Sequence, residues 1–447
     1  MTGFKNLVDV AVDFGPFTCI AGPNAVGKSN LLNAIEFLSL LSCSSFHDAC
    51  VQVRPTSQRQ LDMCALLSAD VLESRENLRL GAEMILPPWA EDEFGQTVAP
   101  SCRYVRYEVE IAVRRDGTIP GGFRLRLAGE RLHPLDDWEA RLRFPQAQSY
   151  ARFIASRLED SCDCYMDYEA SHGEGMVVVH REANGRTRHV RAGGAQRTVL
   201  SAVANADYPT ILAARTEMAS WRFLALEPTA MRTPDDLMER RPISATGAHV
   251  PATLYRQDLS AGQDGAVFAR VCDTVRALVD IRSLRVEEDS VRQALELRAQ
   301  IGDNPELPAR ALSDGTLRFL TLAAIGASAD YYGMLCLEEP ENGIHPAKIN
   351  NLYCLLHELS KPSVDSLRQV IVNTHSPYLF QCTDAAEVLF AVGRQARNDD
   401  GEALQSVDFR PLAGTWRTQG GNDGVRSVPR SAVVDYLKRP QPAAEVG

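Results

Sequence analysis

Residues 22–29 of this 447-residue chain read Gly-Pro-Asn-Ala-Val-Gly-Lys-Ser, which matches the phosphate-binding pattern G-x-x-x-x-G-K-S. The apolar run Phe17–Ala21 before it predicts a buried strand, and residues 30–38 carry apolar side chains at helical spacing. A strand, a glycine-rich loop and a helix in this order direct backbone N–H groups and a helix N-terminus at a phosphate. The segment therefore predicts a P-loop, with an ordinary glycine-rich turn as the plainer interpretation.

A P-loop of this kind assigns chemistry to individual residues. Lys28 supplies a positive charge for the β- and γ-phosphates of ATP, and the Ser29 hydroxyl can be a ligand for Mg²⁺. The glycines let the backbone approach the anion closely. We expect ATP and Mg²⁺ as cofactors, with ATP bound through Gly22, Asn24, Gly27, Lys28, Ser29 and Asn30.

A second apolar run, Tyr332–Leu337, predicts a buried strand that ends in two adjacent acids. Beside a P-loop this arrangement is typical of a Walker B segment, in which Glu338 organises the Mg²⁺ shell and Glu339 orients or deprotonates the attacking water. Aspartate is the usual first acid, so the longer Glu338 would act through a water molecule. A core strand that meets solvent at acidic side chains is the plainer alternative.

The loop Leu312–Thr316 stands before an apolar helical run that ends at Ala327. Its Leu-Ser-x-Gly core places a serine at a helix start, where backbone N–H groups favour an anion. A serine in this position is also an ordinary N-cap.

The last of the four segments follows the apolar run Gln369–Val372, which predicts one more buried strand. Asn373–Pro377 comes directly after it and contains His375. A histidine after a strand often does no more than satisfy a turn, so its meaning depends on the segments around it.

In this chain order, the four segments resemble the RecF/SMC/OLD branch of the ABC-type ATPases. More narrowly, they are similar to compact bacterial AAA family ATPases with an OLD-like head and no Toprim domain. Leu337–Pro346 and Leu226–Arg232 also resemble segments of that group.

The resemblance implies roles and partners. Ser313 and Gly315 would contact the γ-phosphate of ATP bound to another subunit, and His375 would join Glu339 and Lys28 as a catalytic residue. The family implies an ATP-sandwich dimer, work on or near DNA, and frequent roles in phage defence. Because about 70 residues follow His375, a Toprim nuclease has no room, and a nuclease or toxin would come from a partner.

The expected fold is α/β: a P-loop NTPase head of ABC type with a large α+β insertion. The head would comprise residues 1–60 and 300–447, and the insertion residues 61–299. Period-two alternation predicts an antiparallel unit at about 100–132, and the stretch from about 133 to 299 is expected to be mainly helical.

Charge and composition indicate the cellular compartment and the partners to expect. No apolar run reaches membrane-spanning length, no signal peptide is visible, and eleven cysteines fit a reducing compartment, so we expect a cytoplasmic protein. The net charge of −11 disfavours general polyanion affinity but allows a local basic face. That face is either a DNA contact or a solvated hairpin, and it consists of Arg181, Arg186, Arg188, Arg191 and Arg197.

Two other patterns are weak. Cys162 and Cys164 with His172 and His180 have poor spacing for zinc. Gln58 and Gln60 are the candidates for a Q-loop glutamine.

The favoured interpretation is an ATPase that acts as a sensor or scaffold for an effector in anti-phage defence. A RecF-like DNA-maintenance ATPase is the alternative within enzymes. A nucleotide-gated switch that does not hydrolyse ATP and sequesters an effector is the alternative outside them.

Overall fold

The structure is a computed structural model. It describes residues 1–53, 65–118, 122–136, 153, 164–171, 174–182, 186–262, 264–328, 331–362, 367–397, 403–418, 426–429, 431 and 433.

A six-stranded sheet in the order β10-β15-β16-β1-β17-β18 forms the centre of the fold. All neighbours in it are parallel except β17 and β18. The three strands expected from apolar runs are confirmed as β1, β15 and β16, and the α/β P-loop fold is confirmed with them. The strands are β1 (Phe17–Ala21), β10 (Arg222–Leu224), β15 (Gly333–Glu338), β16 (Arg368–Asn373), β17 (Val388–Arg397) and β18 (Ala403–Pro411).

Helices cover both faces of this sheet, which explains why its inner strands are apolar throughout. On one face, α1 (Lys28–Leu40) packs Leu31 and Ile35 into the core that also holds Cys336. On the other face lie α11 (Asp314–Ala327) and α12 (Ile349–Leu359), which share a core with Leu335. α13 (Pro377–Cys382) follows β16.

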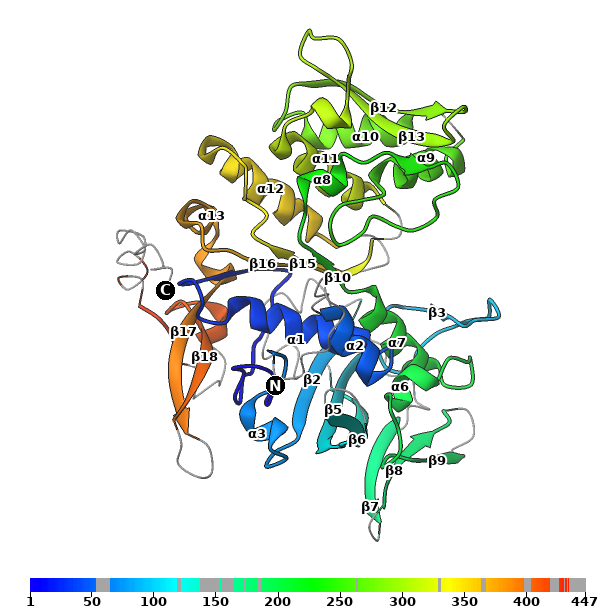
Figure 1. The fold of residues 1–447 in the computed structure, drawn as a ribbon, viewed down its shortest axis with the longest axis vertical. Coiled ribbons are helices and arrows are strands. Elements are labelled where there is room, and N and C mark those ends of the chain that lie inside the picture. The colour runs from blue at the N-terminus through cyan, green and yellow to red at the C-terminus, as the bar shows by residue number, and fades with distance from the viewer. Residues whose placement is uncertain are drawn as a thin grey trace.

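A second six-stranded sheet, antiparallel throughout and in the order β2-β5-β6-β7-β8-β9, lies beyond α1 (Figure 1). The predicted antiparallel unit is confirmed as β5 and β6, whose burial alternates along β5. β8 and β9 pair as an antiparallel hairpin at the far edge of this sheet. The strands are β2 (Leu78–Ile85), β5 (Tyr104–Arg115), β6 (Phe123–Pro134), β7 (Met166–Ser171), β8 (Glu174–His180) and β9 (Thr187–Arg191).

A smaller lobe stands at the top of Figure 1 and surrounds α11. It contains the β12–β13 hairpin, the short strands β11 and β14, and three helices that precede α11 in the chain. Its elements are α8 (Pro228–Met231), β11 (Asp235–Asp236), α9 (Val250–Ser260), α10 (Ala266–Val275), β12 (Ile281–Asp289), β13 (Ala294–Ile301) and β14 (Leu307–Pro308).

The stretch from about 133 to 299 differs from the expectation of a mainly helical region. Among its described residues, strands β7 to β13 alternate with helices. The chain after Thr198 forms two separate helices, α6 (Val199–Ala202) and α7 (Pro209–Ser220), because Pro209 starts a new helix at its N1 position. The chain then enters β10, so a strand from within the expected insertion joins the central sheet.

The remaining α-helices and strands lie outside the central sheet and the upper lobe. They are α2 (Phe46–Val53), α3 (Ala69–Leu72), β3 (Ala90–Glu91), β4 (Thr97–Val98), α6 (Val199–Ala202) and α7 (Pro209–Ser220). Among the described residues, no helix is both long enough and apolar enough to cross a membrane.

Candidate nucleotide-binding site

The P-loop connects β1 to α1 in a backbone conformation that requires its glycines. Gly22 has φ 151° and Gly27 has φ 114°. A Cβ at Gly22 would lie 2.8 Å from the Ala391 carbonyl oxygen, and one at Gly27 would lie 2.6 Å from Asn6 Nδ2. Both positions therefore exclude side chains for two reasons, the left-handed backbone and close neighbours.

Lys28 reaches back over its own loop. Its Nζ donates hydrogen bonds to the carbonyl oxygens of Gly22 and Pro23, each at 2.8 Å. Burial lowers the pKa of this ammonium, while the carboxylates of Glu339 and Glu341 act in the opposite direction. The loop thus holds a desolvated positive charge at its centre, where a phosphate gains most from it.

Three oxygen-bearing side chains meet beside the P-loop. Asn373 Nδ2 donates to Ser29 Oγ at 3.0 Å, and Asn373 is the register partner of Glu338 across β15 and β16. Within the described residues, Glu338 Oε1 and Asn373 Oδ1 are buried without a hydrogen-bond partner. A hydroxyl, a carboxylate and an amide oxygen with spare acceptor capacity fit Mg²⁺. Asn373 was not predicted as a ligand, because only the strand pairing brings it here.

The predicted catalytic acid and the predicted histidine are in contact. Glu339 Oε1 lies 2.9 Å from His375 Nδ1, and Glu339 Oε2 accepts a hydrogen bond from Asn342 Nδ2 at 2.7 Å. Glu339 has φ 46°, a conformation that costs a side-chain-bearing residue free energy. The two side chains are more than one-third exposed. The carboxylate is thus oriented at the edge of the site, where water has access.

A buried polar group lies behind these residues and was missed by sequence reasoning. Glu341 is 6% exposed and accepts a hydrogen bond from Thr374 Oγ1, while its Oε2 has no partner among the described residues. Arg318 of α11 is 8% exposed, and both Glu341 and Asp314 act on it electrostatically. Arg318 therefore stands between the start of α11 and the acids that follow β15.

The loop before α11 is held by Arg232. The Arg232 guanidinium donates to Asp314 Oδ1 at 2.5 Å and to the Leu312 carbonyl oxygen at 3.1 Å. Ser313 is the N-cap of α11, and its Oγ accepts from the Thr316 N–H at 3.2 Å. A Cβ at Gly315 would make ordinary van der Waals contacts, with the Gly343 carbonyl oxygen at 3.7 Å.

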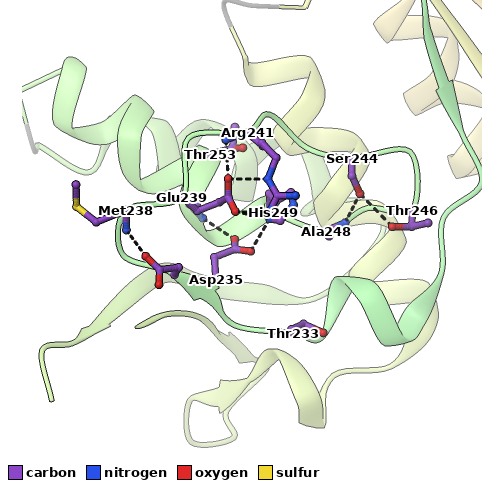
Figure 2. Close-up of polar contacts among 12 residues, drawn as sticks. Thr233, Asp235, Met238, Glu239, Arg241, Ser244, Thr246, Ala248, His249 and Thr253 are labelled. Atoms are coloured by element: carbon purple, nitrogen blue, oxygen red, sulfur yellow. Dashed lines mark hydrogen bonds and ion pairs between the residues drawn. The ribbon is translucent and has the colours of Figure 1, made fainter. Parts of the chain in front are cut away.

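The segment after Arg232 is fixed by a cluster of polar contacts (Figure 2). His249 Nδ1 lies 2.9 Å from Asp235 Oδ1, and Asp235 Oδ2 accepts from the Ala252 N–H at 3.0 Å. Glu239 accepts from the backbone and guanidinium of Arg241, which lowers the pKa of Glu239 to about 2. These contacts hold in place the segment that follows Arg232, the residue that supports the loop before α11.

The structure gathers some predicted residues and separates others. Lys28, Ser29, Glu338, Glu339 and His375 lie around the carboxyl ends of β1, β15 and β16. No hydrogen bond or ion pair between described residues joins Ser313 or Gly315 to residues 22–30. Figure 1 places α11 in the upper lobe, well above α1.

Asn30 and Asn24 are the two remaining residues predicted to bind ATP through the P-loop. Asn30 Nδ2 donates to Asn6 Oδ1 at 2.8 Å, so its side chain braces the loop against the N-terminal segment. Asn24 is exposed. Gln58 and Gln60 lie outside the described residues.

The other sequence patterns fall in the antiparallel sheet. Arg181 forms an ion pair with Asp207, and Arg186, Arg188 and Arg191 lie on or beside the β8–β9 hairpin. Cys164 Sγ donates to the Met166 carbonyl oxygen at 2.9 Å. Cys162 and His172 lie outside the described residues, within which no group of three or more His, Cys, Asp or Glu side chains could hold a metal ion.

Comparison with known families identifies part of the chain. Residues 203–381 match the family described as "AAA domain, putative AbiEii toxin, Type IV TA system". The match includes α11, β15 and β16, and it ends after His375. The P-loop at residues 22–29 lies outside the matched stretch, which is similar to an AAA-type ATPase domain. No curated protein matches the sequence.

Solved structures with a similar fold include head domains of SMC proteins. One is the SMC head bound to the C-terminal winged-helix domain of ScpA, with 14% identity, 91% of this chain and 95% of that chain covered, and a TM-score of 0.43. The head from Pyrococcus furiosus, bound to the C-terminal domain of ScpA, has 13% identity, coverage of 92% and 94%, and a TM-score of 0.43. The head from Thermotoga maritima has 12% identity, coverage of 92% and 96%, and a TM-score of 0.35.

Proposed function

We propose that this protein hydrolyses ATP in a head-to-tail dimer, in which the P-loop of one subunit is completed by the Ser313 loop of the other. The observation that carries the proposal is the contact between Glu339 and His375 beside the buried ammonium of Lys28. A P-loop, a paired acid and a histidine in this arrangement supply charge neutralisation and water orientation, which are the main requirements of phosphoryl transfer.

Each residue then has one task. Lys28 exchanges its loop carbonyl partners for the terminal phosphates, and Glu339 orients the attacking water and takes its proton. His375 holds the Glu339 carboxylate and would contact the γ-phosphate. Ser29, Glu338 and Asn373 would hold Mg²⁺, which neutralises charge on the phosphates when bound.

We propose the dimer because α11, which is capped by Ser313 and contains Gly315, belongs to the upper lobe (Figure 1). The start of α11 offers backbone N–H groups to an anion, and a P-loop in the same subunit is not within hydrogen-bonding contact. Arg232 neutralises Asp314, whose negative charge would otherwise repel an incoming phosphate. A second subunit can bring its P-loop to this surface.

We also propose a cytoplasmic role as a sensor or scaffold for a partner effector, a nuclease or toxin, in bacterial anti-phage defence. The family description names a toxin–antitoxin system, which favours this role over DNA maintenance of the RecF type. Residues 1–60 and 300–447, with β10 added, would form the ATPase head. The rest of residues 61–299 would determine partner specificity or contact DNA. The motifs themselves fit the OLD-like branch.

Turnover of purified protein with ATP, Mg²⁺ and DNA separates these alternatives. ATP hydrolysis that needs no DNA, with an effector chain identified in a pull-down of native protein, supports the sensor. Hydrolysis that depends on DNA supports the maintenance ATPase. Tight ATP binding without turnover, in the presence of the effector, would indicate a switch that does not hydrolyse ATP.

A further inference from the structure

A cavity of about 620 Å³ lies away from the candidate ATP site. Its walls are β2, β5 and β6, the N-terminal segment 10–16, helices α1 and α7, and the starts of β15 and β16. Glu338 and Asn373 stand at the opposite, carboxyl ends of those two strands. The cavity therefore occupies the other edge of the parallel sheet, and its volume is typical of sites for small molecules.

One part of the wall is apolar. Ile35 and Leu38 of α1, Met84 of β2, Trp221 after α7 and Met334 of β15 all line it. Apolar surface of this kind favours a ligand that has a hydrocarbon or aromatic body.

Arg103 supplies a buried positive charge in the same wall. It is 9% exposed, and its Nε donates to the Leu86 carbonyl oxygen at 2.9 Å. Among the described residues, its terminal guanidinium nitrogens make no hydrogen bond and no direct ion pair. The guanidinium carbon of Arg103 lies 5.8 Å from the centroid of the Phe153 ring, which leaves the terminal N–H groups available as donors to an anion.

Six carboxylates line the cavity, and three of them, Glu83, Glu110 and Glu130, are engaged by other groups. Glu83 pairs with Arg106 and Glu110 with Arg79 on the sheet. Glu130 belongs to the core, where it accepts from Tyr107 and the start of α6.

Glu217 is the carboxyl group that acts on Arg103, and it balances that charge only in part. Its Oε1 accepts from Trp221 Nε1 at 3.1 Å, and no direct ion pair with Arg103 is present among the described residues. Burial raises the pKa of Glu217 to about 7, so a fraction of it is neutral at physiological pH. The Arg103 end of the cavity therefore keeps a positive character.

We propose that this cavity binds a small organic anion, a carboxylate or a phosphate monoester with an apolar body, whose charged group pairs with Arg103. Both kinds of anion present two acceptor oxygens to a guanidinium fork, which is why Arg103 suits either of them. The proposal assigns a second ligand to the protein and does not depend on ATP hydrolysis.

Calorimetric titration of the full chain without nucleotide tests it. The probes are phenyl phosphate, phenylacetate and inorganic phosphate. Phenyl phosphate or phenylacetate should bind wild-type protein at millimolar concentration or below, and inorganic phosphate more weakly because it lacks the apolar body. The tighter of the two aromatic anions identifies the charged group that the site prefers.

Variants locate the binding. Arg103→Met should weaken binding about tenfold or more, as loss of a charge-assisted hydrogen bond does, and Arg103→Lys should weaken it less. Arg292→Met is the matched control, because Arg292 is 82% exposed on the β12–β13 turn. Lys28→Ala should leave phenyl phosphate binding unchanged, since the P-loop is not the proposed site.

Three results would overturn the proposal. One is failure of both aromatic anions to bind wild-type protein. Another is unaltered affinity in Arg103→Met, or in Arg103→Lys if the methionine variant does not fold. The third is loss of phenyl phosphate binding in Lys28→Ala, which would assign the anion to the P-loop.

Discussion

His375 Nδ1 lies 2.9 Å from Glu339 Oε1, although the two residues belong to the ends of different strands. The contact forms because β15 and β16 are parallel neighbours in register, with Glu338 opposite Asn373. The contact with His375 holds one carboxylate oxygen, and a hydrogen bond from Asn342 fixes the other. The acid is therefore oriented before any substrate arrives, which lowers the reorganisation required during reaction.

Glu339→Gln should lower kcat by roughly 100-fold or more, because the glutamine cannot accept the proton from water. Its amide keeps the size of the side chain, so ATP binding should persist and the ATP-bound dimer should accumulate. Steady-state turnover with equilibrium nucleotide binding measures the two effects separately. Glu338→Gln is the comparison variant, and weaker Mg²⁺ binding should be its first effect. The reverse pattern in the two variants would exchange their roles.

Arg318→Met should impair turnover without unfolding the protein. Arg318 is a buried cation between Asp314 and Glu341, and apolar replacement of a buried charge is often neutral or stabilising. We expect kcat to fall about tenfold with KM little changed, since a positioning residue orients the Ser313 loop and does not bind substrate itself. Thermal melting checks the fold. A wild-type kcat in this variant, with folding intact, would show that Arg318 does not position the Ser313 loop.

Stability should fall as the pH rises through the range in which Glu217 titrates. Burial raises its folded-state pKa to about 7 from 4.5, so the folded protein binds this proton more tightly than the unfolded chain does. The difference amounts to about 3 kcal/mol at most, lost progressively between about pH 4.5 and pH 7. When the free energy of unfolding is measured with denaturant across that pH range, its decline should be shallower in Glu217→Gln than in the wild-type protein. Identical slopes in the two proteins would show that Glu217 does not titrate in this way.

Replacement of Arg186, Arg188 and Arg191 by glutamate tests the β8–β9 hairpin as a DNA contact. ATP turnover should survive, because the hairpin lies in the antiparallel sheet and not at the P-loop. If the hairpin binds phosphates, DNA affinity should fall, and its salt dependence should weaken by about one unit of slope for each phosphate that the variant no longer neutralises. Unchanged DNA binding would leave the hairpin as a solvated surface.

Local patterns were sufficient for the strands and the loops that carry the motifs. The runs before Gly22, Glu338 and Asn373 are apolar because each strand is buried on both faces, so their sequences predict them without tertiary information. The alternation in β5 and β6 predicts a sheet with one polar face in the same way.

Residues that act through distant contacts could not be predicted. β10 has only three residues and no periodicity, and it becomes a strand because β15 offers it an edge. Arg232 and Asp314 are 82 positions apart, and Arg318 and Glu341 approach only when α11 packs on the sheet. Such pairs depend on tertiary packing, which a single sequence does not reveal.

The central claim is that each ATP site uses residues from two subunits, and a mixture of two inactive variants tests it most directly. Lys28→Ala removes the P-loop charge, and Ser313→Arg obstructs the start of α11. A mixed dimer keeps one intact site, so an equal mixture after subunit exchange should regain roughly a quarter of wild-type turnover, since half of the dimers are mixed. No recovery despite demonstrated exchange, or full activity in a protein shown to be monomeric, would contradict the composite site.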